Sequence, residues 1–482
     1  MPGWLSNLLP ILLLLVAVII VFYRLPKIEV GHSAEFLRRR VLNWLPLGLT
    51  YAFLYMGRYN LEVSKLAFSS LPGSEGQVLM GNADFGFIFG VGTVIYGLSF
   101  LINGPLTDRF GGRISILTGA LGALIMNTLM GLATLSLVHQ GPYSSLIAEN
   151  FVFVFSVLYG LNMYFQSFGA VAIVKVNAPW FHVKERGVFG AIFGILISLG
   201  IYFAFDWNTL ILKTLATDTD KHAGLPWVFF APAILLAIFW VLDLKFVRNT
   251  PGDAGQVDFN TTDASSNDKG ASSGAITVFK MMLRNPIILT IAAVEFCSGF
   301  LRQSIMQWFR TFAKQTDAIL HLKDGFVFEN WGMLLCIAGI LGGVVAGTIS
   351  DHVFGSRRGP VAVLLYSVLL AGALTLVFVY DMAVVGILVI VMSTAVIGVH
   401  GMLSGTAGMD FGGAKNVGIA VGIIDGCVYL GTAAMSFTYA ILLPEEQLGI
   451  TSGPATEPSN WLAWPVAMVP IAAVGLYLAT RL

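Results

Sequence analysis

The sequence predicts an all-helical, polytopic membrane protein built from two related six-helix halves. Of its 482 residues, 56% are hydrophobic and only 11% are charged, whereas soluble domains carry about 25% charged residues. About thirteen apolar segments are long enough to span a bilayer as helices. Long unbroken apolar runs are unlike a transmembrane β-barrel, whose strands alternate in hydrophobicity. The chain is therefore expected to cross the membrane many times as helices.

The predicted spans fall into one extra segment and two sets of six. Residues 4–23 form the extra segment, ahead of the repeated core. The first set covers residues 42–66, 83–102, 114–138, 151–176, 188–205 and 227–247. The second set covers residues 287–309, 331–349, 361–379, 384–403, 417–442 and 461–478. The intervening stretch is polar and rich in Ser, Asp, Asn and Gly, which is typical of a flexible linker. The expected domains are 1–41, 42–247, 248–286 and 287–482.

Two landmarks recur in both halves at one spacing. Each half carries one copy of a glycine-rich basic loop: GPLTDRFGGR over residues 104–113 and GTISDHVFGSRR over residues 347–358. Asp108 and Asp351 lie 243 positions apart, and Arg58 and Arg302 lie 244 apart. Unrelated landmarks that share one offset indicate a duplicated unit. Parallel repeats around a central site are typical of secondary transporters.

The repeated loop is suited to hold helices together in one conformation and release them in another. A glycine in it lets helices approach closely, and its acid can cap or pair at a helix end. The residues expected to form these conformational-switch loops are Gly104, Asp108, Arg109, Arg113, Asp351, Arg357 and Arg358.

Loop charge predicts the orientation of the chain. Cation-rich and cation-poor loops alternate along the chain. The rule that positively charged loops stay inside places the cation-rich loops and the central linker in the cytoplasm. The N-terminus is then outside and the C-terminus cytoplasmic. Residues 4–23 lack a basic leader and a small-residue cleavage site, so we expect a retained, peripheral anchoring helix.

Composition and motifs exclude several other classes of function. The chain has 27 basic and 27 acidic residues, a balance that indicates no nucleic-acid partner. Cys297, Cys336 and Cys427 fall in apolar segments without disulfide or metal spacing. The sequence contains no phosphate-binding P-loop, no GxSxG and no HExxH motif. We therefore expect a non-enzyme without metal or cofactor.

Arg58 and Arg302 each lie inside a long apolar segment, at matching places in the two halves. A charged side chain near the bilayer centre costs about 2.5–3.5 kcal/mol on insertion scales. Both arginines must therefore be compensated, and two facing cations predict an anionic partner. The planar guanidinium fork matches phosphate oxygens.

Several local sequences together resemble the organophosphate:phosphate antiporter family of the major facilitator superfamily. They are YAFLYMGRYN (51–60), WFHVKERG (180–187), FLRQSIMQW (300–308), AGILGGVVAGTISDHVFGSRRG (338–359) and CVYLG (427–431). The resemblance covers the twelve-helix core but not the N-terminal segment. It implies a major facilitator fold, exchange of a glycerol-3-phosphate-like or sugar-phosphate-like substrate for inorganic phosphate by alternating access, a bacterial inner membrane and a monomer.

The resemblance also implies roles for single residues. Arg58 and Arg302 match the two arginines that bind the substrate phosphate in that family. Four tyrosines match aromatic residues that hydrogen-bond phosphate oxygens or pack around the ligand: Tyr51, Tyr55, Tyr96 and Tyr429. For each tyrosine, a role as a core or interfacial aromatic is equally open.

The chain departs from the family pattern in its charged residues. Phe100 stands where glycerol-3-phosphate transporters carry a lysine, and Ile197 where they carry a histidine. An acid, Glu295, lies two turns before Arg302 on the same helix face. We expect it to be a counter-ion of an arginine or a proton carrier. His400 is expected to bond a backbone carbonyl, with a gating or site role as the alternative.

Other charged residues near span ends have ordinary interpretations. Lys175 is expected to reach the cytoplasm or draw anions inward. Glu62 is expected to face the outer water, paired with Lys65 or Arg58. Asp84 and Asp206 are expected to be boundary charges.

Two other functions stay open. A proton-coupled carrier of another organic anion, centred on Glu295, is favoured by the missing lysine and histidine. One member type of the family senses sugar phosphate without transporting it, although no cytoplasmic loop here resembles a dedicated signalling element.

Overall fold

The computed structural model describes residues 31–73, 77–182, 185–261, 275–355, 357–446 and 453–482. The predicted extra segment, residues 4–23, lies outside them. Within these residues the regular elements are helices, with one isolated bridge between Pro72 and Val78. This agrees with the all-helical class that the composition predicts.

Helix ends follow local sequence signals. The helix α2 (Ala34–Phe68) begins after Ser33, whose hydroxyl accepts the Phe36 N–H at 3.1 Å. The helix α11 (Pro286–Gln315) begins after Asn285, whose side chain accepts the Ile287 N–H at 3.0 Å. Such residues satisfy N–H groups that the first helical turn leaves free, and proline suits the first helical position.

Each half contributes a set of long helices. The N-terminal half holds α2, α3 (Asn82–Phe110), α4 (Gly112–Val138), α6 (Phe151–Asn177), α7 (Arg186–Tyr202) and α9 (Trp227–Phe246). A π-helical turn, η4 (Phe203–Trp207), continues α7 into α8 (Asn208–Leu215). The C-terminal half holds α11, α14 (Trp331–Val353), α15 (Arg358–Val379), α16 (Val385–Leu442) and α17 (Ala463–Ala479). Short helices α5 (Ser144–Glu149), α10 (Ala275–Met282), α12 (Asp317–Leu320) and α13 (Phe326–Glu329) lie between them.

Eleven helical segments of the described chain are long and apolar enough to cross a membrane. The helix α2 is 35 residues long and covers the predicted span 42–66. The sequence predicts two spans where the structure has one helix of 58 residues, α16. A straight helix of that length would reach about 87 Å, nearly three times the bilayer core of about 30 Å. We therefore treat Val385–Ser404 and Ile419–Leu442 as its first and second arms.

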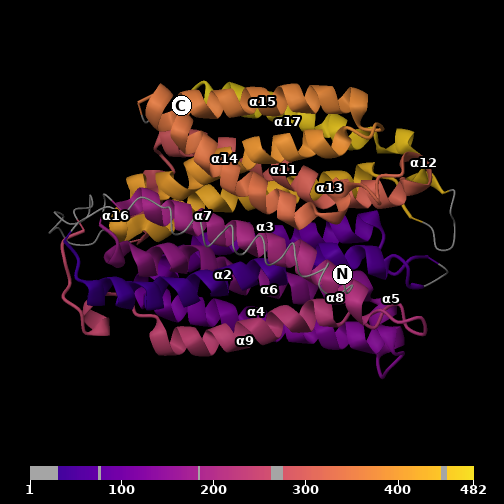
Figure 1. Cartoon of the computed structure of the whole chain (residues 1–482), viewed down its shortest axis with the longest axis horizontal. Coiled ribbons are helices and arrows are strands. Elements are labelled where there is room, and N and C mark those ends of the chain that lie inside the picture. The colour runs from indigo at the N-terminus through magenta and orange to yellow at the C-terminus, as the bar shows by residue number, and fades with distance from the viewer. Residues whose placement is uncertain (1–30, 74–76, 183–184, 262–274, 356, 447–452) are drawn as a thin grey trace, which may run out of the picture.

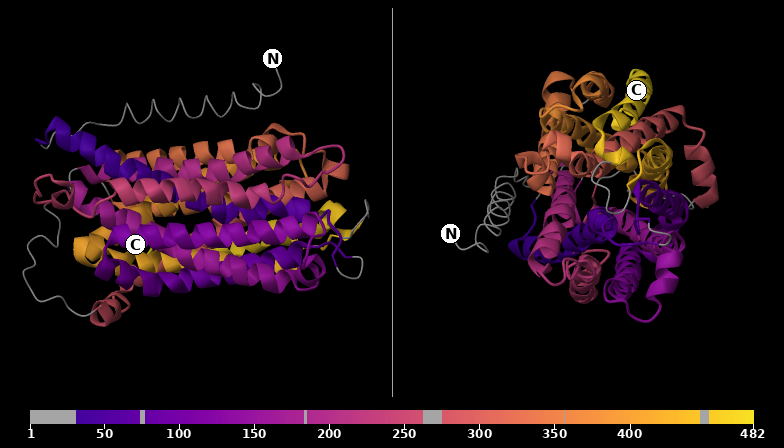
Figure 2. Two further views of the ribbon diagram at one scale, coloured as in Figure 1. Left: turned by 90° about the horizontal axis from the view of Figure 1, so that it is seen from below. Right: turned by 90° about the vertical axis from the view of Figure 1, so that its right-hand side faces the viewer.

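The two halves lie side by side with their helices along the long axis of the molecule (Figure 1). Helices α2, α4, α6 and α9 gather on one side, and α11, α14, α15 and α17 on the other. The end-on view in Figure 2 separates the same halves by colour. They meet mainly where α3 packs on α16 and α7 packs on α14.

Small residues bring the helices of the two halves close together. A side chain added at Gly97 of α3 would meet the Gly426 carbonyl oxygen at 2.9 Å. One added at Gly422 of α16 would meet the Phe100 carbonyl oxygen at 2.8 Å. Glycine at these places lets backbones approach as membrane helices require. The interface between the halves is therefore tightly packed beside the polar site described below.

Candidate functional site

Arg58 lies in the middle of α2 and is fully buried, at 0% exposed. Its Nη2 donates to the hydroxyl of Tyr96 at 2.7 Å, and its Nη1 donates to the hydroxyl of Tyr429. Its Nε donates to Gln166 Oε1 at 3.1 Å. Tyr429 belongs to α16 of the other half. The guanidinium therefore bridges the two halves through a phenol.

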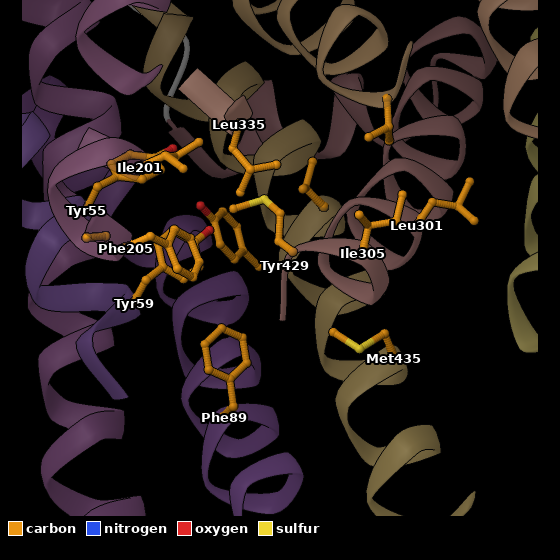
Figure 3. Packing of buried hydrophobic residues seen from close by; sticks show 14 of the residues in the cluster. Tyr55, Tyr59, Phe89, Ile201, Phe205, Leu301, Ile305, Leu335, Tyr429 and Met435 are labelled. Carbon is orange, nitrogen blue, oxygen red and sulfur yellow. The ribbon is translucent and has the colours of Figure 1, made fainter. Parts of the chain in front are cut away.

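Aromatic rings surround the same guanidinium. Its central carbon lies 4.4 Å from the ring centres of both Tyr55 and Tyr96, and 5.5 Å from that of Tyr429. Tyr51 packs edge-on against Tyr55, with ring centres 5.3 Å apart. Cations are attracted to ring faces, so these phenols offset part of the cost of burying the charge. Figure 3 shows Tyr55 and Tyr59 facing Tyr429 across the junction of the halves.

A ladder of amide side chains positions Arg58 from behind. Gln166 donates to Asn162 at 3.0 Å, and Asn162 donates to the Gly57 carbonyl at 3.0 Å. Asn127 donates to the same Asn162 oxygen at 3.0 Å and accepts from Asn60 at 2.7 Å. Because these hydrogen bonds join side chains of three helices, they hold α2, α4 and α6 in one register.

Arg302 lies on α11 and is also buried, at 4% exposed. Its Nε and Nη2 have no hydrogen-bond partner among the described residues. It interacts electrostatically with Glu295 and with the phenols of Tyr59 and Tyr429. Buried cationic donors without acceptors are costly, so this side chain favours an anion within reach.

The next residue, Gln303, ties α11 to the other half. Its side-chain nitrogen donates to the Tyr59 hydroxyl at 2.7 Å, and Tyr59 directly follows Arg58. Tyr429 interacts electrostatically with both arginines. The structure thus brings Arg58, Arg302 and Tyr429 into one polar region between the halves.

Phe100 and Ile197, the two residues that depart from the family pattern, differ in how deeply they are buried. Phe100 is fully buried and packs against Tyr96, with ring centres 4.8 Å apart. Ile197 is half-buried against the main core. Among the described residues, Arg58 therefore has aromatic rather than cationic neighbours on α3.

Glu295 of α11 contacts a histidine directly and interacts electrostatically with Arg302. Its Oε2 lies 2.9 Å from His400 Nδ1, while its Oε1 has no hydrogen-bond partner within the described chain. His400 is expected from the sequence to bond a backbone carbonyl. That expectation is wrong, because its Nδ1 contacts the Glu295 carboxylate instead. Asp425, on the second arm of α16, accepts a hydrogen bond from Ser404 on the first arm.

At the end of the molecule opposite the switch loops, each half caps a helix of the other. Asp206 accepts the N–H groups of Gly332 and Met333, the first turn of α14, at 2.9 and 2.8 Å. Glu445, just beyond α16, accepts the N–H groups of Asn82 and Ala83, the first turn of α3, at 3.1 and 2.7 Å. The boundary charge expected at Asp206 is thus a contact between the halves.

Lysines strengthen the same closed end. Lys65 donates to Asn82, and Lys314 of α11 donates to the Leu66 carbonyl at 2.7 Å. The expectation that Glu62 faces outer water is wrong, since its side chain is only 5% exposed. Glu62 interacts electrostatically with Arg310 of α11 and with Lys65, the latter being one of its expected partners.

The switch loops are described in part. Asp108 forms an ion pair with Lys175 of α6 at 2.7 Å, so Lys175 binds the loop in this structure. Arg113 donates to the Leu244 carbonyl at 2.8 Å. Gly104 is buried, and Arg109 and Arg357 are exposed. Arg358 is the first residue of α15 and is half-buried, while the side chain of Asp351 lies outside the described part of the chain.

Among the site residues that the sequence analysis did not name, one is marked by its position in the sequence. Asp425 is an acid inside the predicted span 417–442, and a search for every acid within a span would have found it. Glu445 and the amides Gln166 and Asn162 had no such signal, since single polar residues in or beside apolar segments are common.

Comparisons with known proteins agree with this architecture. A glycerol-3-phosphate transporter of Bacillus subtilis (strain 168) is 27% identical over 430 residues, covering 84% of this chain and 86% of the relative. A probable hexose phosphate transport protein of Chlamydia pneumoniae is 22% identical and covers 95% of both chains. The membrane sensor protein UhpC of Escherichia coli (strain K12) is 23% identical, covering 86% of this chain and 88% of UhpC.

A solved structure and a family description extend the likeness to the fold. The structure is a bacterial homologue of the human lysosomal transporter Spinster, in an inward-facing and unoccupied conformation. It matches with a TM-score of 0.64 at 14% identity, covering 93% of this chain and 98% of that one. The family described as Major Facilitator Superfamily matches residues 47–436. This chain is an integral multi-pass membrane protein that belongs to the major facilitator superfamily, and its relatives are consistent with the organophosphate:phosphate antiporter family within it.

Proposed function

We propose that this protein exchanges an organophosphate for inorganic phosphate by alternating access, with the phosphate held between Arg58 and Arg302. One observation carries the proposal. Each half contributes one buried guanidinium, the two share Tyr429, and Arg302 has unpaired donors within the described chain. The names of the relatives, glycerol-3-phosphate and hexose phosphate transporters, support phosphate as the recognised group.

The hydrogen bonds of Arg58 explain how a phosphate would enter. Its terminal nitrogens donate to two neutral phenols, whereas hydrogen bonds to an ionised phosphate oxygen are about twice as strong. Phosphate oxygens would therefore displace the phenols, which would then donate to the same phosphate. Tyr51 and Tyr55 stay beside the ligand as packing aromatics.

Charge repulsion supplies a reason for exchange. Two guanidinium charges about 10 Å apart repel by about 1.7 kcal/mol at an effective dielectric of about 20. A phosphate between them turns this repulsion into attraction and draws the halves together. An ionised Glu295 near Arg302 lessens the repulsion but does not remove it. The loaded carrier then closes more readily than the empty one, so a returning phosphate is needed to reset it.

The two capped helices suggest how one end opens and closes. The contacts of Asp206 and Glu445 join opposite halves, and their breakage would let the halves tilt apart. The Asp108–Lys175 pair lies at the other end, next to the predicted switch loop. We place the closed end outside a bacterial inner membrane, with the C-terminus and the switch loops in the cytoplasm.

Two observations favour other candidates. The Glu295–His400 pair suits a proton-coupled carrier of another organic anion. The likeness to UhpC, named a membrane sensor protein, suits a non-transporting sensor. A sensor would bind its ligand without moving it, and a proton-coupled carrier would lose concentrative uptake in a protonophore.

Radiolabelled phosphate exchange in proteoliposomes tests the proposal. We expect uptake to depend on unlabelled phosphate inside, to survive a protonophore, and to be inhibited by glycerol-3-phosphate or hexose phosphates. Arg302→Lys should lose exchange while keeping normal expression. Arg481→Lys is the matched control, because Arg481 is exposed and its guanidinium donates to the Tyr477 hydroxyl at 3.1 Å, away from the proposed site. Full exchange by the Arg302→Lys variant would contradict the phosphate clamp.

A further inference from the structure

Three helical segments of the C-terminal half bring two acids and a histidine together beside Arg302. Glu295 comes from α11, His400 from the first arm of α16 and Asp425 from its second arm. Glu295 is fully buried, and its Oε2 contacts His400 Nδ1 at 2.9 Å. Asp425 interacts electrostatically with His400, Glu295 and Arg302. Separate elements of the fold therefore build one cluster of titratable groups.

The groups around this cluster leave one oxygen atom, Glu295 Oε1, without a hydrogen-bond donor among the described residues. Tyr366 of α15 faces Glu295 but donates its hydroxyl to the Val294 carbonyl at 2.6 Å. Cys297 of α11 also interacts with Glu295. Tyr96 of α3 and Tyr429 interact with Asp425. Among the described residues, no group donates to Glu295 Oε1, although this atom is buried.

The charges of the site do not suit a phosphate when both acids are ionised. Arg58 and Arg302 carry two positive charges, and Glu295 and Asp425 would carry two negative ones. A bound phosphate dianion would then leave two uncompensated negative charges in a buried region. Burying an uncompensated charge costs several kcal/mol. Each proton added to the cluster removes one unit of this imbalance.

We propose that the Glu295–His400–Asp425 cluster is a proton-binding site that takes up a proton when phosphate binds at Arg302. The inference rests on the proposed phosphate function and adds to it the regulation of that site by protons. The acceptors are the carboxylates of Asp425 and of Glu295, whose Oε1 has no hydrogen-bond partner among the described residues. Thermodynamic linkage then requires that protons strengthen phosphate binding by the same factor as phosphate strengthens proton binding.

The geometry favours a proton over a cationic group of the substrate. Glu295 has 0% side-chain exposure and is covered by His400, so a substrate ammonium group has no access to it. The His400 side chain is 18% exposed, so the imidazole is the member of the pair that lies nearer the surface of the protein. A histidine beside a buried acid is suited to pass protons to it.

Calorimetric proton counting on the purified protein tests the proposal. Inorganic phosphate is titrated at pH 8, where it is mainly the dianion, in buffers that differ in their heat of ionisation. Wild type should take up about one proton per phosphate bound, and Glu295→Gln and Asp425→Asn should take up fewer. Asp243→Asn is the matched control, because Asp243 is a buried acid of the other half that accepts one hydroxyl, from Thr50, at 2.6 Å.

The outcomes separate this inference from the proposed function. Absence of phosphate binding by wild type would contradict the proposed function itself. Phosphate binding without proton uptake would overturn the proton site. Uptake that persists unchanged in both Glu295→Gln and Asp425→Asn would also overturn it, because the proton would then reside on the phosphate. If one of the two variants fails to fold, the other variant and the wild-type count still decide.

Discussion

Asp206 of the N-terminal half accepts the backbone N–H of Met333 in the C-terminal half at 2.8 Å, at the first turn of α14. Glu445 makes the reverse contact on Ala83, at the first turn of α3, at 2.7 Å. The first turn of a helix exposes unpaired N–H groups and carries a partial positive charge, so a carboxylate stabilises it. The duplicated halves therefore close one end of the molecule by exchanging equivalent caps.

Removal of both caps should open this end. Each carboxylate at a helix N-terminus contributes about 0.3–2 kcal/mol, so the Asp206→Ala and Glu445→Ala double variant should shift the closed–open equilibrium by about tenfold. Distances between spin labels at Phe87 and Ile441, both exposed near this end, should lengthen and broaden. Asp317→Asn is the control, because Asp317 accepts the Lys323 N–H of its own half at 2.9 Å. An unchanged distance distribution in the double variant would exclude the caps as the closing contacts.

Acidification should favour the closed end, because a protonated Glu445 still accepts backbone N–H groups as a cap and no longer carries a buried charge. Burial raises the pKa of Glu445, although the N–H groups of Ala83 and Asn82 and the charge of Lys65 act against this. In the open state the carboxyl reaches water and regains an ordinary pKa, so the closed state binds the proton more tightly. Closure should therefore increase as the pH falls through the raised pKa, and this dependence should weaken in Glu445→Gln, which leaves Asp206 as the remaining carboxyl cap. The same spin-label distances, recorded between pH 7.5 and pH 5, would show the opposite trend if the contact depended on ionised Glu445.

The sequence predicted the helical class, the duplication and Arg58 and Arg302 because each has a one-dimensional signature. A charge inside an apolar segment stands out, and a repeated loop gives an offset that can be counted. The partners of these residues have no such signature. Gln166 and Asn162 contact Arg58 and its neighbour only because α6 is rotated toward α2, and a single sequence does not fix that rotation.

The helix caps between the halves also could not be predicted from the sequence alone. Asp206 stands near a predicted span end, where charged residues are ordinary. Its role depends on which helix of the other half begins beside it, and only the packing of α7 on α14 decides this. Glu295 and His400 are 105 positions apart in sequence, so their pairing also required the assembled fold.

Tyr429→Phe should weaken phosphate binding and leave the protein folded. Its hydroxyl contacts Arg58 and lies in the field of both arginines, so its loss removes one donor to the phosphate. A single hydrogen bond to a charged group contributes about 1.5–3 kcal/mol, which predicts a loss of affinity of about 10–100-fold. Tyr439→Phe is the control, since the Tyr439 hydroxyl donates to Trp464 within its own half at 2.8 Å. Equal phosphate affinities for the two variants, measured by titration, would remove Tyr429 from the site.

Two substitutions at Gln166 should affect phosphate binding to different extents. Gln166 accepts the Arg58 Nε–H at 3.1 Å and orients the guanidinium fork. Gln166→Leu leaves that donor unpaired and the fork less well held, which should lower phosphate affinity by about tenfold. Gln166→Glu keeps the acceptor but adds a negative charge that pairs with Arg58 and competes with the anion. The acidic variant should therefore bind phosphate more weakly than the leucine variant, and the difference should shrink as the pH falls and the new carboxyl is protonated. The reverse order, with Gln166→Glu binding as wild type does, would mean that Arg58 acts only as a structural cation and does not contact the phosphate.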